Sequence, residues 1–377
     1  MLLLKYLVDS VPVLRSVAEL LDEAQSVDAA AVEAILGNPW VAVRLARFAR
    51  QPTSALHCEA MSAVALAAAV RVGLPDRRVL LTPTRGAVMV PTLGMLRRDG
   101  PGRFGAPDLC GPDWYPVRAV RAECGGQRME IAVEDLDPYR DCHGHPVRSR
   151  LTEPEFHELD RLFSAAWRLL VVCSPARAAE VAAGLTALVP LGTARRVSSD
   201  VGAAAPGCSA TNEDAFGGFG TTLPRDPVQL AVTMVHEIQH SKLCALGALV
   251  PLSHTDHSAT YFAPWRPDPR PLSGLLQGIY AFVAVAEFWA DLGDLPEFRG
   301  RAMPEFAATR AQVRHALTGI ENSPGLTPAG RRFVDQVSAR VRRLGGVVVD
   351  ASAERDVSAR LADLETRWRA RRLDRLR

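Results

Sequence analysis

Two histidines four residues apart, with a glutamate directly after the first, are the residues whose types and spacing could most directly do chemistry. They are His236 and His240 with Glu237, in the stretch AVTMVHEIQHSKLCALGALVPL that covers 231–252. On a helix this spacing puts both imidazoles on one face, where they can reach a single metal ion. The pattern predicts a metal site, and in a zinc peptidase Glu237 would be the general base. A purely structural histidine pair is the alternative interpretation.

A third ligand would have to come from outside this helix. The apolar stretch SGLLQGIYAFVAVAEFW that follows supplies Gln277 and Glu287, and the loop between the two stretches supplies His254, Asp256 and His257. We expect Gln277, one turn into its helix, to be the third metal ligand. Glu287 lies nearly three turns farther along, and the loop residues are expected to be exposed polar residues.

Two arginines lie in the proline-rich segment FAPWRPDPRP, between the two apolar stretches. Arg266 and Arg270 are each flanked by prolines, which stiffen the backbone. A rigid guanidinium group near a metal suits the bidentate capture of a carboxylate. The alternative is a surface ion pair with Asp268.

Composition and charge exclude several classes of protein. The 377 residues are 48% hydrophobic and 23% charged, and the formal net charge of +2 gives no reason to expect nucleic acid as a partner. The apolar opening MLLLKYLVDSVPVL is interrupted by Lys5 and Asp9, so we expect neither a membrane span nor a signal peptide. Seven cysteines without a C-x-x-C pair are typical of reduced thiols. The chain is therefore expected to be cytoplasmic.

The elements that must position these residues can be read from the apolar periodicity. Helices are expected over much of 10–75, at 151–170, at 175–191, at 227–248 and at 273–292, with short strands between 78 and 133. The glycine-rich residues 198–224 have no periodicity and are expected to form a loop beside the active site. The predicted fold is α+β and mostly helical. We expect an N-terminal α+β region at 1–195 and a helical metal-site region at 196–377, unless both form one compact body.

Several blocks together resemble a known family. HEIQHSKLCALGALVPL, FAPWRPDPRPLSGLLQGIYAF, TNEDAFGGF, VEDLDPYRD and GAVMVPTLG are similar to the bacterial HExxH-motif peptide-modification proteins of ribosomal peptide pathways, over roughly residues 50–345. That family consists of 2-oxoglutarate-dependent peptide β-hydroxylases. The resemblance implies an iron oxygenase that uses Fe(II), 2-oxoglutarate and O₂. It also implies a ribosomally made precursor peptide as substrate and a radical-SAM maturase of the same pathway as a further partner.

The residues agree with that implication. Non-haem iron oxygenases bind the metal through two histidines and an oxygen donor, which leaves positions open for 2-oxoglutarate and O₂. The distal carboxylate of 2-oxoglutarate would need an arginine, and Arg270 is favoured over Arg266 because it directly precedes the helix of Gln277. Glu237 would then be a ligand or would order the histidines. A zinc peptidase that trims a precursor, and a non-catalytic peptide-binding protein stabilised by its metal, remain the alternatives.

Overall fold

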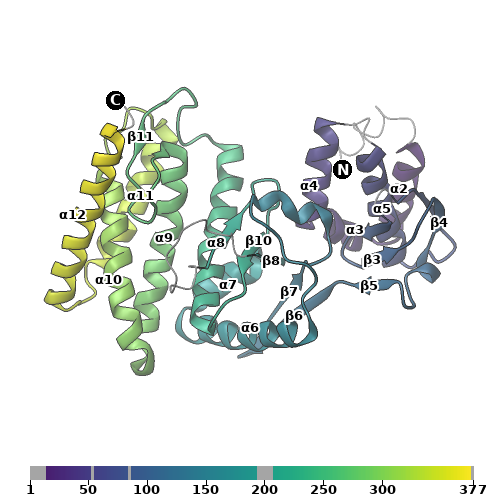
Figure 1. Cartoon of the computed structure of the whole chain (residues 1–377), viewed down its shortest axis with the longest axis horizontal. Helices are drawn as coiled ribbons and strands as arrows, with labels where there is room; N and C mark the ends of the chain where they lie inside the picture. Colours follow the sequence, from purple (N-terminus) through teal and green to yellow (C-terminus); the bar gives the residue numbers. More distant parts are fainter. Residues whose placement is uncertain (1–13, 52–54, 84–85, 193–206, 375–377) are drawn as a thin grey trace. The chain divides into compact units, whose positions relative to one another are not determined.

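The computed structural model describes residues 14–51, 55–83, 86–192 and 207–374, and these form two compact units (Figure 1). The first unit holds the chain as far as Ala122, with Arg128–Ser164 and Leu185–Pro224. The second unit holds Glu123–Gln127, Ala165–Gly184 and the chain from Arg225 onward. The prediction of an α+β, mostly helical fold is confirmed.

The division between the units differs from the boundary expected between 195 and 196. Residues 209–222 form strands that pair with strand β8 (Ala187–Leu191), so they belong to the first unit. Helix α7 (Pro175–Gly184) precedes that strand but packs on a helix of the second unit. Each segment thus follows its packing partners and not its neighbours along the chain.

Four helices of the first unit pack around one apolar core. They are α2 (Arg15–Val27), α3 (Ala29–Leu36), α4 (Pro39–Arg50) and α5 (Ala55–Arg71). The side chains of Asp28 and Asn38 accept hydrogen bonds from backbone N–H groups of the first turns of α3 and α4, which caps both helices. Residues Phe48, Met61 and Val64 are among those that fill the core between these helices.

Short strands complete the first unit in three sheets. Strand β1 (Val79–Leu81) pairs with β4 (Gly102–Phe104), and a second antiparallel sheet has the order β2 (Ala87–Val90), β3 (Gly94–Arg97), β5 (Trp114–Pro116). The five-stranded sheet has the order β6 (Arg118–Cys124), β7 (Gln127–Val133), β8, β10 (Gly218–Thr222), β9 (Ser209–Thr211). Strand β8 is parallel to both β7 and β10 and is buried along its whole length.

Two sequence-based expectations are wrong in this sheet. Residues 175–191 were expected to be one helix, but α7 ends at Gly184 and the apolar run ALVPL is strand β8. Residues 209–222 were expected to be loop but contain β9 and β10. A Cβ on Gly218 would lie 2.9 Å from the Pro39 Cβ, so the glycines of β10 serve close packing. The part of that expected loop at 198–206 lies outside the described residues.

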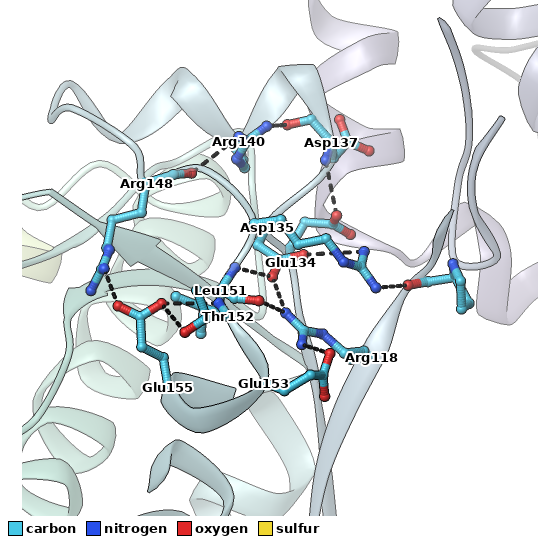
Figure 2. A network of polar contacts seen from close by, with 12 residues as sticks. Arg118, Glu134, Asp135, Asp137, Arg140, Arg148, Leu151, Thr152, Glu153 and Glu155 are labelled. Carbon is cyan, nitrogen blue, oxygen red and sulfur yellow. Dashed lines mark hydrogen bonds and ion pairs between the residues drawn. The ribbon is translucent and has the colours of Figure 1, made fainter. Parts of the chain in front are cut away.

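A network of charged groups around the buried Asp135 links the segment after β7 to helix α6 (Glu153–Cys173), whose exposed Glu153 accepts a hydrogen bond from Arg118 at 3.0 Å (Figure 2). Helix α6 begins in the first unit and ends in the second. The Asp135 carboxylate accepts hydrogen bonds from the Arg118 guanidinium at 2.7 Å and from the Leu151 N–H at 2.9 Å. Arg140 donates to the backbone oxygens of Asp137 and Arg148, as expected for a structural turn. The network anchors a segment that has little regular structure of its own.

The second unit is a helical assembly that positions the histidine pair. It contains α8 (Pro227–Leu249), α9 (Leu272–Gly293), α10 (Pro296–Thr318), α11 (Pro328–Leu344) and α12 (Ala351–Asp374), together with α7. Helix α8 begins at Pro227 because the Asp226 side chain accepts a hydrogen bond from the Gln229 N–H, and α9 packs along α8 (Figure 1). Strands β11 (Thr260–Tyr261) and β12 (Arg270–Pro271) close the loop between them.

Helix α9 is long and apolar enough to cross a membrane, and it is the one such helix among the described residues. Within its most apolar window, 67% is buried inside the structure. The residues Leu276, Ile279 and Val283 belong to an apolar core that α9 shares with α10 and α11. This burial is typical of the core helix of a soluble protein.

Candidate metal site

The two histidines of α8 point their ring edges at each other. The Nε2 atoms of His236 and His240 are 2.9 Å apart, and both side chains are half-buried. Burial, and then the neighbouring His240, lower the pKa of His236 to about 3. Its imidazole is therefore neutral at physiological pH, which is the state that binds a metal.

The amide of Gln277 on α9 determines which nitrogen of His240 carries the proton. Its Oε1 lies 3.1 Å from the Nδ1 of His240, and its Nε2 lies 3.4 Å from the Sγ of Cys244. An amide oxygen only accepts hydrogen bonds, so Nδ1 must be the donor in this arrangement. The proton on Nδ1 leaves a lone pair on the Nε2 of His240, directed at His236.

This arrangement differs from the prediction that Gln277 is a metal ligand. Its oxygen contacts Nδ1, on the other side of the His240 ring from the edge that faces His236. Gln277 therefore orients His240 and fixes its tautomer, which is the usual role of a residue that hydrogen-bonds to a metal-binding histidine. Among the described residues, no group of three or more His, Cys, Asp and Glu side chains comes together that could hold a metal.

The separation of the two nitrogens fits a shared metal ion. Two imidazole nitrogens bound at about 2.1 Å to one metal lie about 3.0 Å apart when they subtend 90°, and about 3.4 Å apart at the tetrahedral angle. The 2.9 Å between the Nε2 atoms of His236 and His240 is nearer the first value. The alternative is a hydrogen bond between two neutral rings, in which His236 would donate from Nε2.

Aromatic side chains form one wall of the site. The ring of Phe282 lies 4.8 Å from that of His236, and the Trp265 ring lies 4.8 Å from Phe282 on α9. The indole can lie against α9 only because residue 278 is glycine: a Cβ there would be 2.4 Å from the Trp265 ring. The histidine pair thus lies beside a rigid apolar surface. The side chains of His236, Phe282 and Trp265 are all half-buried.

The two candidate arginines have different surroundings. Arg266 is exposed (43%) and pairs with Asp268 at 2.7 Å. Arg270 is less exposed (32%), lies 3.7 Å from the same carboxylate and crosses the first turn of α9, where its guanidinium would be 2.8 Å from a Cβ on Gly274. Residues 274 and 277 are three apart, so the Arg270 guanidinium lies about one helical turn from Gln277. Arg270 is therefore the arginine that lies against α9, the helix that carries Gln277.

The other acidic and imidazole candidates are occupied elsewhere or exposed. Glu287 forms ion pairs with Arg177 at 2.9 Å and with Arg340 at 2.7 Å. His254 and Asp256 are exposed as expected, whereas His257 Nε2 lies 2.7 Å from the Tyr261 hydroxyl.

Glu237 is 1% exposed and has interaction partners of its own. A buried carboxylate must be paired or hydrogen-bonded, and next to His236 it remains the candidate acid–base residue.

Sequence reasoning missed the wall formed by Trp265 and Phe282 and the role of Cys244. One signal was present: Gly274, Gly278 and Phe282 follow each other at four-residue spacing, so they share one face of α9. Small residues in a row on an apolar helix indicate that other groups approach its backbone closely.

Comparison with known proteins gives no family for this chain. No family model matches it, and no curated protein matches its sequence. The resemblance to the HExxH-motif peptide-modification proteins therefore stays a prediction.

Proposed function

We propose that the chain is an Fe(II)- and 2-oxoglutarate-dependent hydroxylase that acts on the β-carbon of a residue in a ribosomally made peptide. The observation that carries this proposal is the pair of converging nitrogens of His236 and His240, 2.9 Å apart, with Gln277 fixing the tautomer of His240. This nitrogen separation is compatible with two neighbouring ligands of one metal ion.

Each residue has a separate task in this proposal. His236 and His240 hold the iron, and the bound iron supplies the activation of O₂. In the net reaction, 2-oxoglutarate and O₂ give succinate and CO₂ while one oxygen atom enters a C–H bond of the peptide. Arg270 binds the distal carboxylate of 2-oxoglutarate, and Glu237 moves or holds a proton beside His236. Trp265 and Phe282 keep water from one side of the reacting groups.

The two arginines offer a matched test of co-substrate binding. Arg270→Ala should raise the half-saturating concentration of 2-oxoglutarate by roughly thirtyfold or more, because losing one partner of a charge pair costs about 2–5 kcal/mol. Arg266→Ala should leave it nearly unchanged, since Arg266 is exposed and already paired with Asp268. Turnover measured against 2-oxoglutarate concentration decides between them. An unchanged value for Arg270→Ala would remove this residue from the site.

The reaction itself is tested by co-expression with a candidate precursor peptide and mass spectrometry of the peptide. We expect a gain of one oxygen atom, located on one residue by fragmentation. A shortened peptide would instead support a zinc peptidase with Glu237 as general base, and an unmodified but bound peptide would support a non-catalytic binding protein. A cytoplasmic location and a radical-SAM maturase in the same pathway belong to the same proposal.

A further inference from the structure

The first unit contains a pocket of its own. Its volume is about 270 Å³, and its walls come from α4, α5, β2, β3 and the segment that follows β7. The apolar lining consists chiefly of Ala60, Ala63, Met89 and Met95, and the two methionines face each other as a cross-strand pair between β2 and β3. A small pocket with a mainly apolar lining suits a compact apolar group.

One side of this pocket carries buried donors that have no acceptor. Arg44 is 1% exposed, and its Nη2 lies 2.6 Å from the Asp137 carboxylate. Its Nε and Nη1 are buried without a hydrogen-bond partner among the described residues, and the same is true of the Tyr139 hydroxyl. The guanidinium of Arg44 lies over the Tyr139 ring, 4.6 Å from its centre. Buried donors of this kind are unfavourable unless a ligand atom or a water accepts hydrogen bonds from them.

The charges around the pocket determine which kind of acceptor fits. Arg44 is paired with Asp137, and Arg47 is paired with Asp141 at 2.5 Å. Glu59 adds a further carboxylate to the lining. The two guanidinium charges are therefore already balanced, and a ligand with a negative charge of its own would lack compensation. A neutral carbonyl oxygen can accept hydrogen bonds from the unpaired donors of Arg44 and Tyr139 without adding charge.

We propose that this pocket binds an apolar residue of a peptide, with its backbone carbonyl accepting hydrogen bonds from Arg44 and Tyr139 and its side chain against Met89 and Met95. The choice of a peptide rests on the proposed function. The unpaired donors and the apolar lining together suit a neutral amide carbonyl joined to a compact apolar group. The pocket would then contribute to selection of the peptide, separately from the reaction at the metal.

Binding to the metal-free full-length chain tests this proposal independently of hydroxylation. The probe is N-acetyl-leucine N-methylamide, observed by ligand-detected NMR, with the glycine analogue and N-acetyl-leucinate as comparisons. The leucine amide should bind at least about tenfold more tightly than the glycine analogue, because only leucine has an apolar side chain to bury. It should also bind more tightly than the carboxylate.

Two variants locate the binding. Tyr139→Phe removes a buried hydroxyl that has no partner, so it should weaken binding of the leucine amide about tenfold without lowering the melting temperature of the free protein. Ala60→Leu should fill the pocket and abolish binding, whereas Ala34→Leu, at an exposed position of the same unit, should not. Tighter binding of the carboxylate, equal binding of the glycine analogue, or unchanged binding in both pocket variants would overturn the proposal.

Discussion

The contact between Gln277 and His240 orients the histidine pair of the candidate metal site. Because the amide oxygen of Gln277 accepts from Nδ1 of His240, the Nε2 lone pair is directed toward His236 before any metal arrives. The amide is itself held through Cys244, which lies four residues after His240 on α8. These four side chains, from α8 and α9, form one connected set of contacts at the candidate metal site.

Removing the Gln277 amide should weaken metal binding. Gln277→Ala should lower the affinity for Fe(II) about 10–100-fold, the usual effect of losing a residue that orients a metal-binding histidine. Gln277→Glu should retain binding, since its carboxylate also accepts from Nδ1, and Gln336→Ala on the exposed face of α11 is the control. Anaerobic Fe(II) titration measures the affinities.

X-ray absorption spectroscopy of the same variants separates the two roles of Gln277. An orienting residue leaves the number of metal ligands from the protein unchanged in Gln277→Ala, whereas a direct ligand would be lost. Wild-type affinity in Gln277→Ala would contradict both roles.

At the scale of the element, one face of α9 is shaped to receive other parts of the second unit. Gly274 lies under the Arg270 guanidinium and Gly278 under the Trp265 indole, while Phe282 contacts His236. A single helix face therefore positions the candidate carboxylate-binding arginine, the apolar wall and a candidate metal ligand. Two glycines lower the helical propensity of α9, and the close packing that they permit offsets this cost.

Adding a methyl group at Gly278 should disturb this face. Gly278→Ala places a Cβ 2.4 Å from the rigid Trp265 ring and should lower the free energy of unfolding by about 1–3 kcal/mol. Gly247→Ala on α8 is the matched control, because nothing lies within 4 Å of its Cβ; it should stabilise the protein by about 0.5–1 kcal/mol. Denaturant unfolding gives both values, and a stabilised Gly278→Ala protein would contradict the packing of Trp265 on α9.

Much of the second unit could be predicted from the sequence, because its signals are local. The apolar periodicity that predicted helices at 227–248 and 273–292 places His236 and His240 correctly on one helix. Gln277 was correctly predicted to lie near the pair. The direction of its amide could not be predicted, since it depends on the Nδ1 atom and the Cys244 sulfur that it meets.

The first unit was harder to predict, because its strands depend on partners far away in the sequence. ALVPL is a short apolar run that suits a helix or a buried strand equally, and its pairing with β7 and β10 decides the outcome. The glycines of GFGTT suggested a loop, yet they allow Pro39 and Leu191 to approach β10. Neither partner can be identified from the segment alone.

At the scale of the whole molecule, the two candidate sites lie in different units. The second unit holds the candidate metal site, and the first unit holds the pocket and the charge network of Figure 2. Within that network, burial, and then the nearby Asp137, raise the pKa of Glu134 to about 8. Glu134 is therefore protonated in the folded protein at neutral pH, while its Oε1 accepts a hydrogen bond from the Asp137 N–H.

The raised pKa makes stability depend on pH in a definite direction. The pKa of Glu134 is higher in the folded state than in the unfolded state, so its contribution to stability is complete below about pH 4.5 and is lost as the pH rises through about 8. Relative to Glu134→Gln, the wild type should lose up to about 1.4 kcal/mol of unfolding free energy per pH unit between pH 5 and 8.

Chemical denaturation at several pH values measures this difference. Glu305→Gln, at an exposed position, is the control and should follow the wild type. Parallel pH profiles for wild type and Glu134→Gln would contradict the protonated state of Glu134.

The central claim is that His236 and His240 bind iron for a reaction that consumes 2-oxoglutarate. Its most direct test is the O₂-dependent conversion of 2-oxoglutarate to succinate by the Fe(II)-loaded protein in the presence of the candidate precursor peptide, whose C–H bond takes up the second oxygen atom. We expect succinate from the wild type and from His254→Ala, whose exposed imidazole lies in the same unit, and none from His236→Ala, His240→Ala or the Zn²⁺-loaded protein. Equal succinate formation by the two metal-site variants, or none by the iron-loaded wild type, would contradict the account.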